Sequence, residues 1–240
     1  MQIPNAAHRT RMAYARVAGL MFLLYIVVDM AGPALFGVGT NGSGTAARLA
    51  GMAQHAGNVR IDAALGLLTG FIAVILAVAL YAITRERDLN LATLGLLCRV
   101  GEGLVGSLSI PLTLGLLSLA TANGANAPDG PATQAMAAFI FAARDWYPTL
   151  SAMFFAVGSL CFAWILLRGR LIPVLWAWLG LIASILLVVC LPVQLAGFLP
   201  DSLGTLIWIP MAVFEIPLGV WMLIKGVNPM PTEGSLAQPG

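Results

Sequence analysis

Five ionisable side chains lie in or at the edge of long apolar stretches, where a charge is costly. Asp29, Arg99, Glu102 and Glu215 lie deep in such stretches, and Asp62 lies just inside another. A charged residue at the centre of a membrane helix costs about 2.5 to 3.5 kcal/mol on insertion scales, so each one needs a partner or a function. These five residues are therefore the candidates for binding a ligand or a proton.

Three of these residues are predicted to lie close together. Arg99 and Glu102 are three positions apart and share a helix face, which allows an internal ion pair. At a rise of about 1.5 Å per residue, Arg99 lies roughly 16 Å past Asp88, and Glu215 lies roughly 15 Å before Lys225. We therefore expect Arg99 to contact Glu102 or Glu215 near the middle of the membrane.

The charges of this cluster do not balance, because one arginine faces three carboxylates. Desolvation disfavours a charged carboxylate, so at least one of Asp29, Glu102 and Glu215 is expected to be protonated near neutral pH or neutralised by a cation. The leading hypothesis is that Arg99, Glu102 and Glu215 bind or conduct a small polar or cationic species or relay protons, with Asp29 and Asp62 lining the outer approach. One alternative is a structural or accessory subunit in which the cluster is a salt-bridge clamp. Another is a lipid-active enzyme that uses carboxylates.

The residues for several other chemistries are missing from the sequence. His8 and His55 lie outside the apolar stretches, so an intramembrane haem or histidine-ligated metal has no ligands there. No GxSxG, HExxH or phosphate-binding loop motif is present. The cysteines, Cys98, Cys161 and Cys190, form no CxxC pair and are predicted to be buried apolar residues. We predict no cofactor and no metal, and the sequence favours a protein that is not an enzyme.

Composition indicates the elements that hold the candidate residues. The chain has 240 residues, of which 60% are apolar and 9% are charged, whereas soluble domains carry about 25% charged residues. Its mean hydropathy is +0.92. The formal net charge of +2 argues against binding to nucleic acid. We therefore predict an all-α, polytopic integral membrane helix bundle whose partner is the lipid bilayer.

Six apolar stretches are long enough to cross a bilayer, since about 20 residues suffice. None alternates with the period of two that is typical of outer-membrane barrel strands. The predicted transmembrane helices cover residues 14–38, 61–83, 91–120, 146–168, 171–198 and 204–225. They form a single domain over residues 1–226, followed by a disordered cytoplasmic tail at 227–240.

Basic residues predict the orientation, because Lys and Arg are retained on the cytoplasmic side of a membrane. With the N-terminus inside, eight basic residues fall on the inner side and three on the outer side. The inner ones are Arg9, Arg11, Arg16, Arg85, Arg87, Arg168, Arg170 and Lys225, and the outer ones are Arg48, Arg60 and Arg144. Both termini are therefore predicted to be cytoplasmic, in the cell inner (plasma) membrane.

The two outer connections carry further predicted structure. Residues 39–60 begin with a polar, Gly-rich turn and become weakly helical at 46–55. Residues 121–130 form a polar loop, and residues 131–143 form an Ala-rich helix. Such short helices cap the bundle, lie in the lipid interface or form a lid, and periodicity leaves these three alternatives open.

Small residues and prolines mark places where helices pack closely or bend. Gly66 and Gly70 form a GxxxG pair, which predicts close helix packing. Pro210 and Pro217 flank Glu215, which favours a kinked helix there over the unwound backbone found in transporters with broken helices.

Several short motifs also occur in a characteristic order. They are Arg16-Val-Ala-Gly-Leu at the start of the first helix, Asp62, Ala79-Leu80-Tyr81 with Arg85, Arg99-x-x-Glu102, the Gly169 to Pro173 turn before Leu179-Gly180, Pro210 to Glu215, Trp221 and Lys225-Gly226. With them, residues 16–226 resemble the domain of unknown function 4386 family, six-helix bacterial membrane proteins without an assigned activity. The resemblance implies the fold and a shared set of polar residues, but no substrate. Family members tend to carry Leu and Gly where this chain has Ala63 and Phe214.

Overall fold

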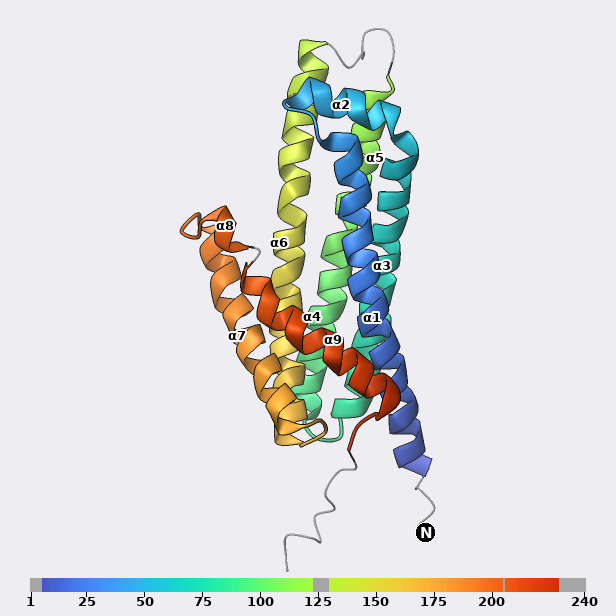
Figure 1. Cartoon of the computed structure of the whole chain (residues 1–240), viewed down its shortest axis with the longest axis vertical. Helices are drawn as coiled ribbons and strands as arrows, with labels where there is room; N and C mark the ends of the chain where they lie inside the picture. The colour runs from blue at the N-terminus through green and yellow to red at the C-terminus, as the bar shows by residue number, and fades with distance from the viewer. Residues whose placement is uncertain (1–5, 123–129, 205, 229–240) are drawn as a thin grey trace, which may run out of the picture. The chain divides into compact units, whose positions relative to one another are not determined.

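The computed structural model describes residues 6–122, 130–204 and 206–228, and no strand occurs among them. Its elements are α1 (Ala6–Thr40), α2 (Thr45–Gln54), α3 (Ala56–Thr84), α4 (Leu89–Ser107), α5 (Ser109–Ala120), α6 (Pro131–Arg168), α7 (Val174–Leu195), α8 (Asp201–Gly204), the 3₁₀ turn η2 (Leu206–Trp208) and α9 (Ile209–Ile224) (Figure 1). Residues 229–240 of the predicted tail and 123–129 of the predicted polar loop lie outside the described residues.

Among the described residues, six helical stretches are long and apolar enough to cross a membrane. They are His8–Thr40, Ala56–Thr84, Leu89–Ala120, Pro131–Arg168, Val174–Leu195 and Leu206–Ile224. A helix suits this setting because it satisfies its backbone polar groups internally, which lipid cannot do. The predicted all-helical, multi-pass membrane fold is confirmed.

The fourth of these stretches begins earlier than predicted. The sequence predicts separate helices at 131–143 and 146–168, but α6 is continuous from Pro131 to Arg168 and contains Pro148. Pro131 begins the helix, where its missing N–H costs no hydrogen bond, and the Ala-rich segment after it has a high helix propensity. The predicted helix 131–143 is therefore the first part of a long spanning helix.

The third stretch is interrupted where the sequence predicts one helix over 91–120. Its two parts, α4 and α5, are separated at Leu108. The N–H of Leu108 donates to the carbonyl oxygen of Val105 at 3.1 Å, which is the tighter turn of a 3₁₀ helix. Pro111 then lies in the first turn of α5, where no backbone donor is required.

The described helices pack as two compact units. Unit 1 comprises Met1–Leu23, Ile75–Arg99 and Phe155–Gly240, and unit 2 comprises Leu24–Val74 and Val100–Phe154. The helices α1, α3, α4 and α6 each contribute one part to each unit. Arg99 and Glu215 lie in unit 1, whereas Asp29, Asp62 and Glu102 lie in unit 2.

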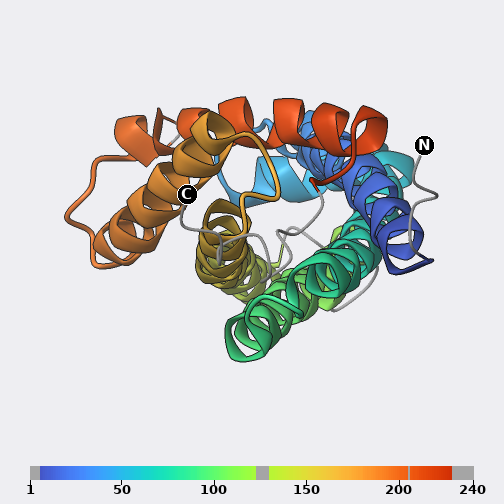
Figure 2. The same ribbon diagram turned by 90° about the horizontal axis from the view of Figure 1, so that it is seen from below.

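In unit 1, α9 runs obliquely from α7 to the first part of α1 (Figures 1 and 2). Glycine allows the close approach at the α1 end, because a Cβ on Gly19 would lie 2.5 Å from both the carbonyl oxygen of Gly219 and the nitrogen of Leu223. At the α7 end, the ring of Phe214 lies against Gly180, where a Cβ would collide with it. Small residues therefore set the position of α9 in this unit.

In unit 2, α2 lies across the ends of α1, α3 and α5 (Figure 1). It closes a buried apolar cluster made of Phe36 of α1, Leu49 and Met52 of α2, Val59 of α3, Leu116, Leu117 and Ala120 of α5, and Ala137 and Phe141 of α6. Of the three roles that the sequence leaves open for the 46–55 helix, α2 takes that of a cap on the helices of its unit.

The GxxxG pair of α3 also lies in unit 2. A Cβ on Gly70 would lie 3.2 Å from the carbonyl oxygen of Gly103 on α4, and a Cβ on Gly103 would lie 2.9 Å from the carbonyl oxygen of Gly70. Gly66 makes an ordinary contact with Ile110. Close packing is thus confirmed, and it depends mainly on Gly70.

Candidate functional site

A small cavity in unit 1 brings together two of the predicted residues, Arg99 of α4 and Glu215 of α9. The cavity volume that is open to the centre of a water molecule is about 20 Å³. Holding one water molecule requires about 10 to 15 Å³ of such volume. The other lining residues are Phe22, Leu80, Ser159, Phe162, Ala163, Leu166, Phe214 and Leu218. The cavity therefore has space for a water molecule between two ionisable groups in a mostly apolar lining.

Both ionisable residues of the cavity are buried, with Arg99 only 1% exposed and Glu215 7% exposed. The guanidinium carbon of Arg99 lies 4.6 Å from the ring centroid of Phe155 on α6. The stem of Arg99 packs against Gly158, where a Cβ would lie 2.9 Å from the Cγ of Arg99. The aromatic ring and the glycine of α6 thus position the arginine.

The backbone that carries Glu215 is helical. The helix α9 runs from Ile209 to Ile224 with Pro217 inside it, and the 3₁₀ turn η2 precedes Pro210. Unwound backbone beside the carboxylate, the less favoured alternative from the sequence, is not present. Glu215 therefore reaches the cavity from a regular helix face.

Glu102 lies in unit 2 and is 2% exposed. The hydroxyl of Tyr25 on α1 donates to its Oε1 at 2.5 Å, and Ser151 on α6 donates to its backbone oxygen at 2.9 Å. Tyr25 was missed by reasoning from the sequence, although a tyrosine inside an apolar helix is a signal that its hydroxyl has a partner. The contact of Arg99 with Glu102 or Glu215 stays a prediction.

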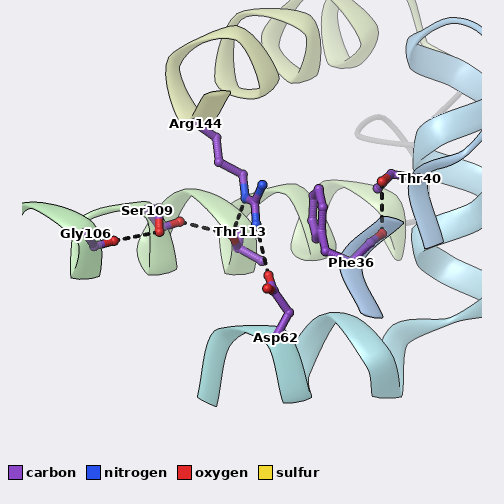
Figure 3. Close-up of polar contacts among 7 residues, drawn as sticks. All are labelled: Phe36, Thr40, Asp62, Gly106, Ser109, Thr113 and Arg144. Carbon is purple, nitrogen blue, oxygen red and sulfur yellow. Dashed lines mark hydrogen bonds and ion pairs between the residues drawn. The ribbon is translucent and has the colours of Figure 1, made fainter. Parts of the chain in front are cut away.

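A second buried ionic group in unit 2 contains Asp62 (Figure 3). Arg144 of α6 donates from Nη2 to Oδ2 of Asp62 at 3.0 Å and from Nε to the hydroxyl of Thr113 at 2.7 Å. Its guanidinium carbon lies 3.6 Å from the ring centroid of Phe36. Thr113 itself donates to the carbonyl oxygen of Ser109 at 3.0 Å. Arg144 therefore links α6 to α1, α3 and α5.

The sequence placed Asp62 and Arg144 at the same outer level but did not predict their ion pair. The two residues are 82 positions apart, so no local pattern signals the contact. Asp29 of α1 is exposed, and within residues 6–122, 130–204 and 206–228 it has no hydrogen bond or ion pair. Another ion pair that sequence reasoning missed joins Arg11 of α1 to Glu86 beyond α3, in unit 1.

The ion pair of Asp62 and Arg144 is expected to stabilise unit 2. Arg144→Gln should lower the free energy of unfolding by about 2 to 3 kcal/mol, because it leaves a buried carboxylate without its cation. Arg60→Gln removes the same charge from an exposed residue and should change stability by less than about 0.5 kcal/mol. Denaturant unfolding in detergent micelles measures both, and equal losses in the two variants would contradict the role of the pair.

Comparison with known proteins gives a family but no characterised relative. No curated protein and no solved structure matches the chain. A protein-family model, described as Domain of unknown function (DUF4386), matches residues 17–226. This range contains Asp62, Arg99, Glu102 and Glu215, and Phe214 is accommodated by Gly180 in the structure. Because the match covers most of the 240 residues, the chain belongs to the DUF4386 family.

Proposed function

We propose that this membrane protein binds and relays protons, or binds a small polar or cationic species about the size of water, in the cavity between Arg99 and Glu215. The observation that carries the proposal is the cavity, which adjoins two buried side chains of opposite formal charge. Empty cavities in proteins are typically apolar, whereas a water molecule needs two or more polar partners. The carboxyl and guanidinium groups of this cavity supply such partners.

The chemistry of the cavity follows from its size and its two ionisable groups. A space of about 20 Å³ suits one water molecule or one small cation and not a large organic substrate. The carboxyl group of Glu215 can exchange a proton with a water beside it, and as a carboxylate it can bind a cation through oxygen. Arg99 provides fixed donors and positive charge on the other side of the same space.

Infrared titration of the reconstituted protein tests the proton form of this proposal. We expect a protonated carboxyl band near neutral pH that is lost in Glu215→Gln. Glu86→Gln is the matched control, because it removes a carboxylate whose partner, Arg11, lies outside the cavity. Proton entry into vesicles loaded with a pH-sensitive dye should likewise fall at least tenfold in Glu215→Gln and be unchanged in Glu86→Gln.

The cation form of the proposal requires a separate measurement. If a cation neutralises Glu215, then Na⁺, K⁺ or Mg²⁺ should raise the thermal unfolding midpoint of the wild type and have no such effect on Glu215→Gln. Absence of the infrared band, of proton entry and of any cation effect would contradict both forms.

A structural clamp is the second candidate, and one observation favours it. Arg99 is tightly held, with its stem against Gly158 and its guanidinium near Phe155. In this case Arg99 and Glu215 stabilise helix packing without a bound species, as in other buried ion pairs. The clamp predicts that Glu215→Gln lowers stability while the infrared and cation measurements stay negative.

We further propose that residues 1–226 form one membrane domain with both termini in the cytoplasm, in the inner (plasma) membrane. The support is the excess of basic residues, eight against three, on the predicted inner side. Cysteines introduced at Ser43 and at Arg87, in a variant without the three native cysteines, should be labelled from opposite sides of the membrane. Labelling of both from the same side would contradict this topology.

A further inference from the structure

Unit 2 contains two arginine side chains that stack on phenylalanine rings of one buried cluster. The guanidinium carbon of Arg48 on α2 lies 3.7 Å from the ring centroid of Phe141, and that of Arg144 lies 3.6 Å from the ring centroid of Phe36. Both rings belong to the apolar cluster beneath α2. When the flat face of a guanidinium stacks on an aromatic ring, the N–H groups of the guanidinium point outward in its own plane. They can then still donate hydrogen bonds.

The donors of these two arginines are only partly used. Arg144 donates through Nε to Thr113 and through Nη2 to Asp62. Within the described part of the chain, neither Nη1 of Arg144 nor the guanidinium of Arg48 has a hydrogen-bond acceptor. Nη1 of Arg144 and the three nitrogens of the Arg48 guanidinium therefore have hydrogen bonds to donate.

The charges around these donors favour an anion. Arg48 and Arg144 stack on two rings of the same apolar cluster, Phe141 and Phe36, so two positive charges border that cluster and, being alike, disfavour each other. Among the described residues, Arg144 forms its ion pair with Asp62, and Asp145 follows it in the sequence. Arg48 has no ion pair with any described residue. An anion beside Arg48 would reduce the repulsion and accept the remaining hydrogen bonds.

The position of the two arginines suits the polar region of a bilayer. Phe36 lies four residues before the end of α1, and Asp62 lies six residues after the start of α3, which places them roughly 6 and 9 Å inside the helix ends. The 29 residues of α3 extend over roughly 44 Å. A bilayer measures about 40 to 45 Å with its headgroups, so these helix ends reach headgroup level. Arg48 is half-buried and therefore remains accessible there.

We propose that Arg48, together with Nη1 of Arg144, binds a phosphate group, presented by an anionic phospholipid headgroup or as free phosphate. The planar fork of a guanidinium matches two phosphate oxygens, and such charge-assisted hydrogen bonds are stronger than neutral ones. The phosphate would lie beside α2 and link it to α6, which connects the cap of unit 2 to a spanning helix.

The experiment uses the purified full chain in detergent and three probes. Phosphatidylglycerol carries the anionic headgroup, dioleoylglycerol is a lipid without phosphate, and inorganic phosphate has no acyl chains. Binding is measured by native mass spectrometry for the lipids and by the thermal unfolding midpoint for all three. The test variant is Arg48→Gln, and the matched control is Arg60→Gln, which removes the same charge from an exposed residue on α3.

We expect phosphatidylglycerol to bind the wild type and dioleoylglycerol not to bind. Arg48→Gln should weaken phosphatidylglycerol binding at least tenfold, and Arg60→Gln less than twofold. An equally Arg48-dependent effect of inorganic phosphate identifies free phosphate as a sufficient ligand, and its absence identifies the headgroup. If Arg48→Gln does not fold, Arg48→Lys is used to test the proposal instead. This variant keeps the positive charge but loses the planar fork of the guanidinium, so it should weaken phosphatidylglycerol binding at least threefold. Equal losses in the Arg48 and Arg60 variants, or no loss in the Arg48 variants, would overturn the proposal.

Discussion

Arg99→Leu should lower the free energy of unfolding by about 3 to 5 kcal/mol, because it removes a buried cation and, on the proposed coupling across the cavity, leaves the carboxyl group of Glu215 uncompensated. Arg99 is 1% exposed, so solvent cannot replace the lost interaction. The stacking of its guanidinium on Phe155 and its packing against Gly158 are lost at the same time. Denaturant unfolding in detergent micelles, followed by circular dichroism, measures the change.

A double-mutant cycle then tests whether Glu215 is coupled to Arg99 across the cavity. The variant that combines Arg99→Leu with Glu215→Gln should be more stable than the sum of the single changes predicts, by about 1 to 3 kcal/mol. The reason is that the second change removes the carboxyl group that, in the proposed coupling, the first change deprives of the Arg99 charge. Glu86→Gln combined with Arg99→Leu is the control and should be additive, since Glu86 pairs with Arg11. Additive losses in the Glu215 cycle would contradict the coupling.

Gly19→Val is expected to have the other large effect, a loss of at least about 3 kcal/mol and reduced accumulation of folded protein. A Cβ at this position would lie 2.5 Å from two backbone atoms of α9, the oxygen of Gly219 and the nitrogen of Leu223. Backbone atoms cannot avoid the clash by a change of rotamer, as the end of a flexible side chain can. The whole of α9 therefore has to move. This helix also carries Glu215, and the cavity should therefore be disturbed as well.

Gly115→Val is the matched control for this substitution. Gly115 lies in α5, and a Cβ there would have nothing within 4 Å. The same residue exchange should leave stability unchanged or slightly higher, because glycine disfavours a helix. Size-exclusion profiles and unfolding midpoints of the two variants in detergent provide the comparison. A Gly19→Val protein as stable as Gly115→Val would contradict the close packing of α1 and α9.

Local sequence patterns were sufficient to predict the spanning helices but not all their ends. A spanning segment in lipid must be apolar and must satisfy its own backbone hydrogen bonds, and both properties can be read along the chain. The sequence predicts a break at Arg144 and Asp145, because charged residues are typical of positions outside the membrane, whereas α6 continues through both. In the structure Arg144 lies within the helix, where Asp62 from α3 balances its charge.

The chain by itself determined which side chains are costly to bury, and the structure places Asp62, Arg99, Glu102 and Glu215 in buried positions. Tertiary structure decided what each one contacts: Asp62 pairs with Arg144, Glu102 accepts from Tyr25, and Asp29 is exposed. The physical reason is that composition and length determine whether a helix spans the membrane, whereas its rotation and its neighbours depend on close packing between helices. Contacts such as that of Gly19 with Gly219 join segments about 200 residues apart, beyond the three- and four-residue spacing at which helical neighbours meet.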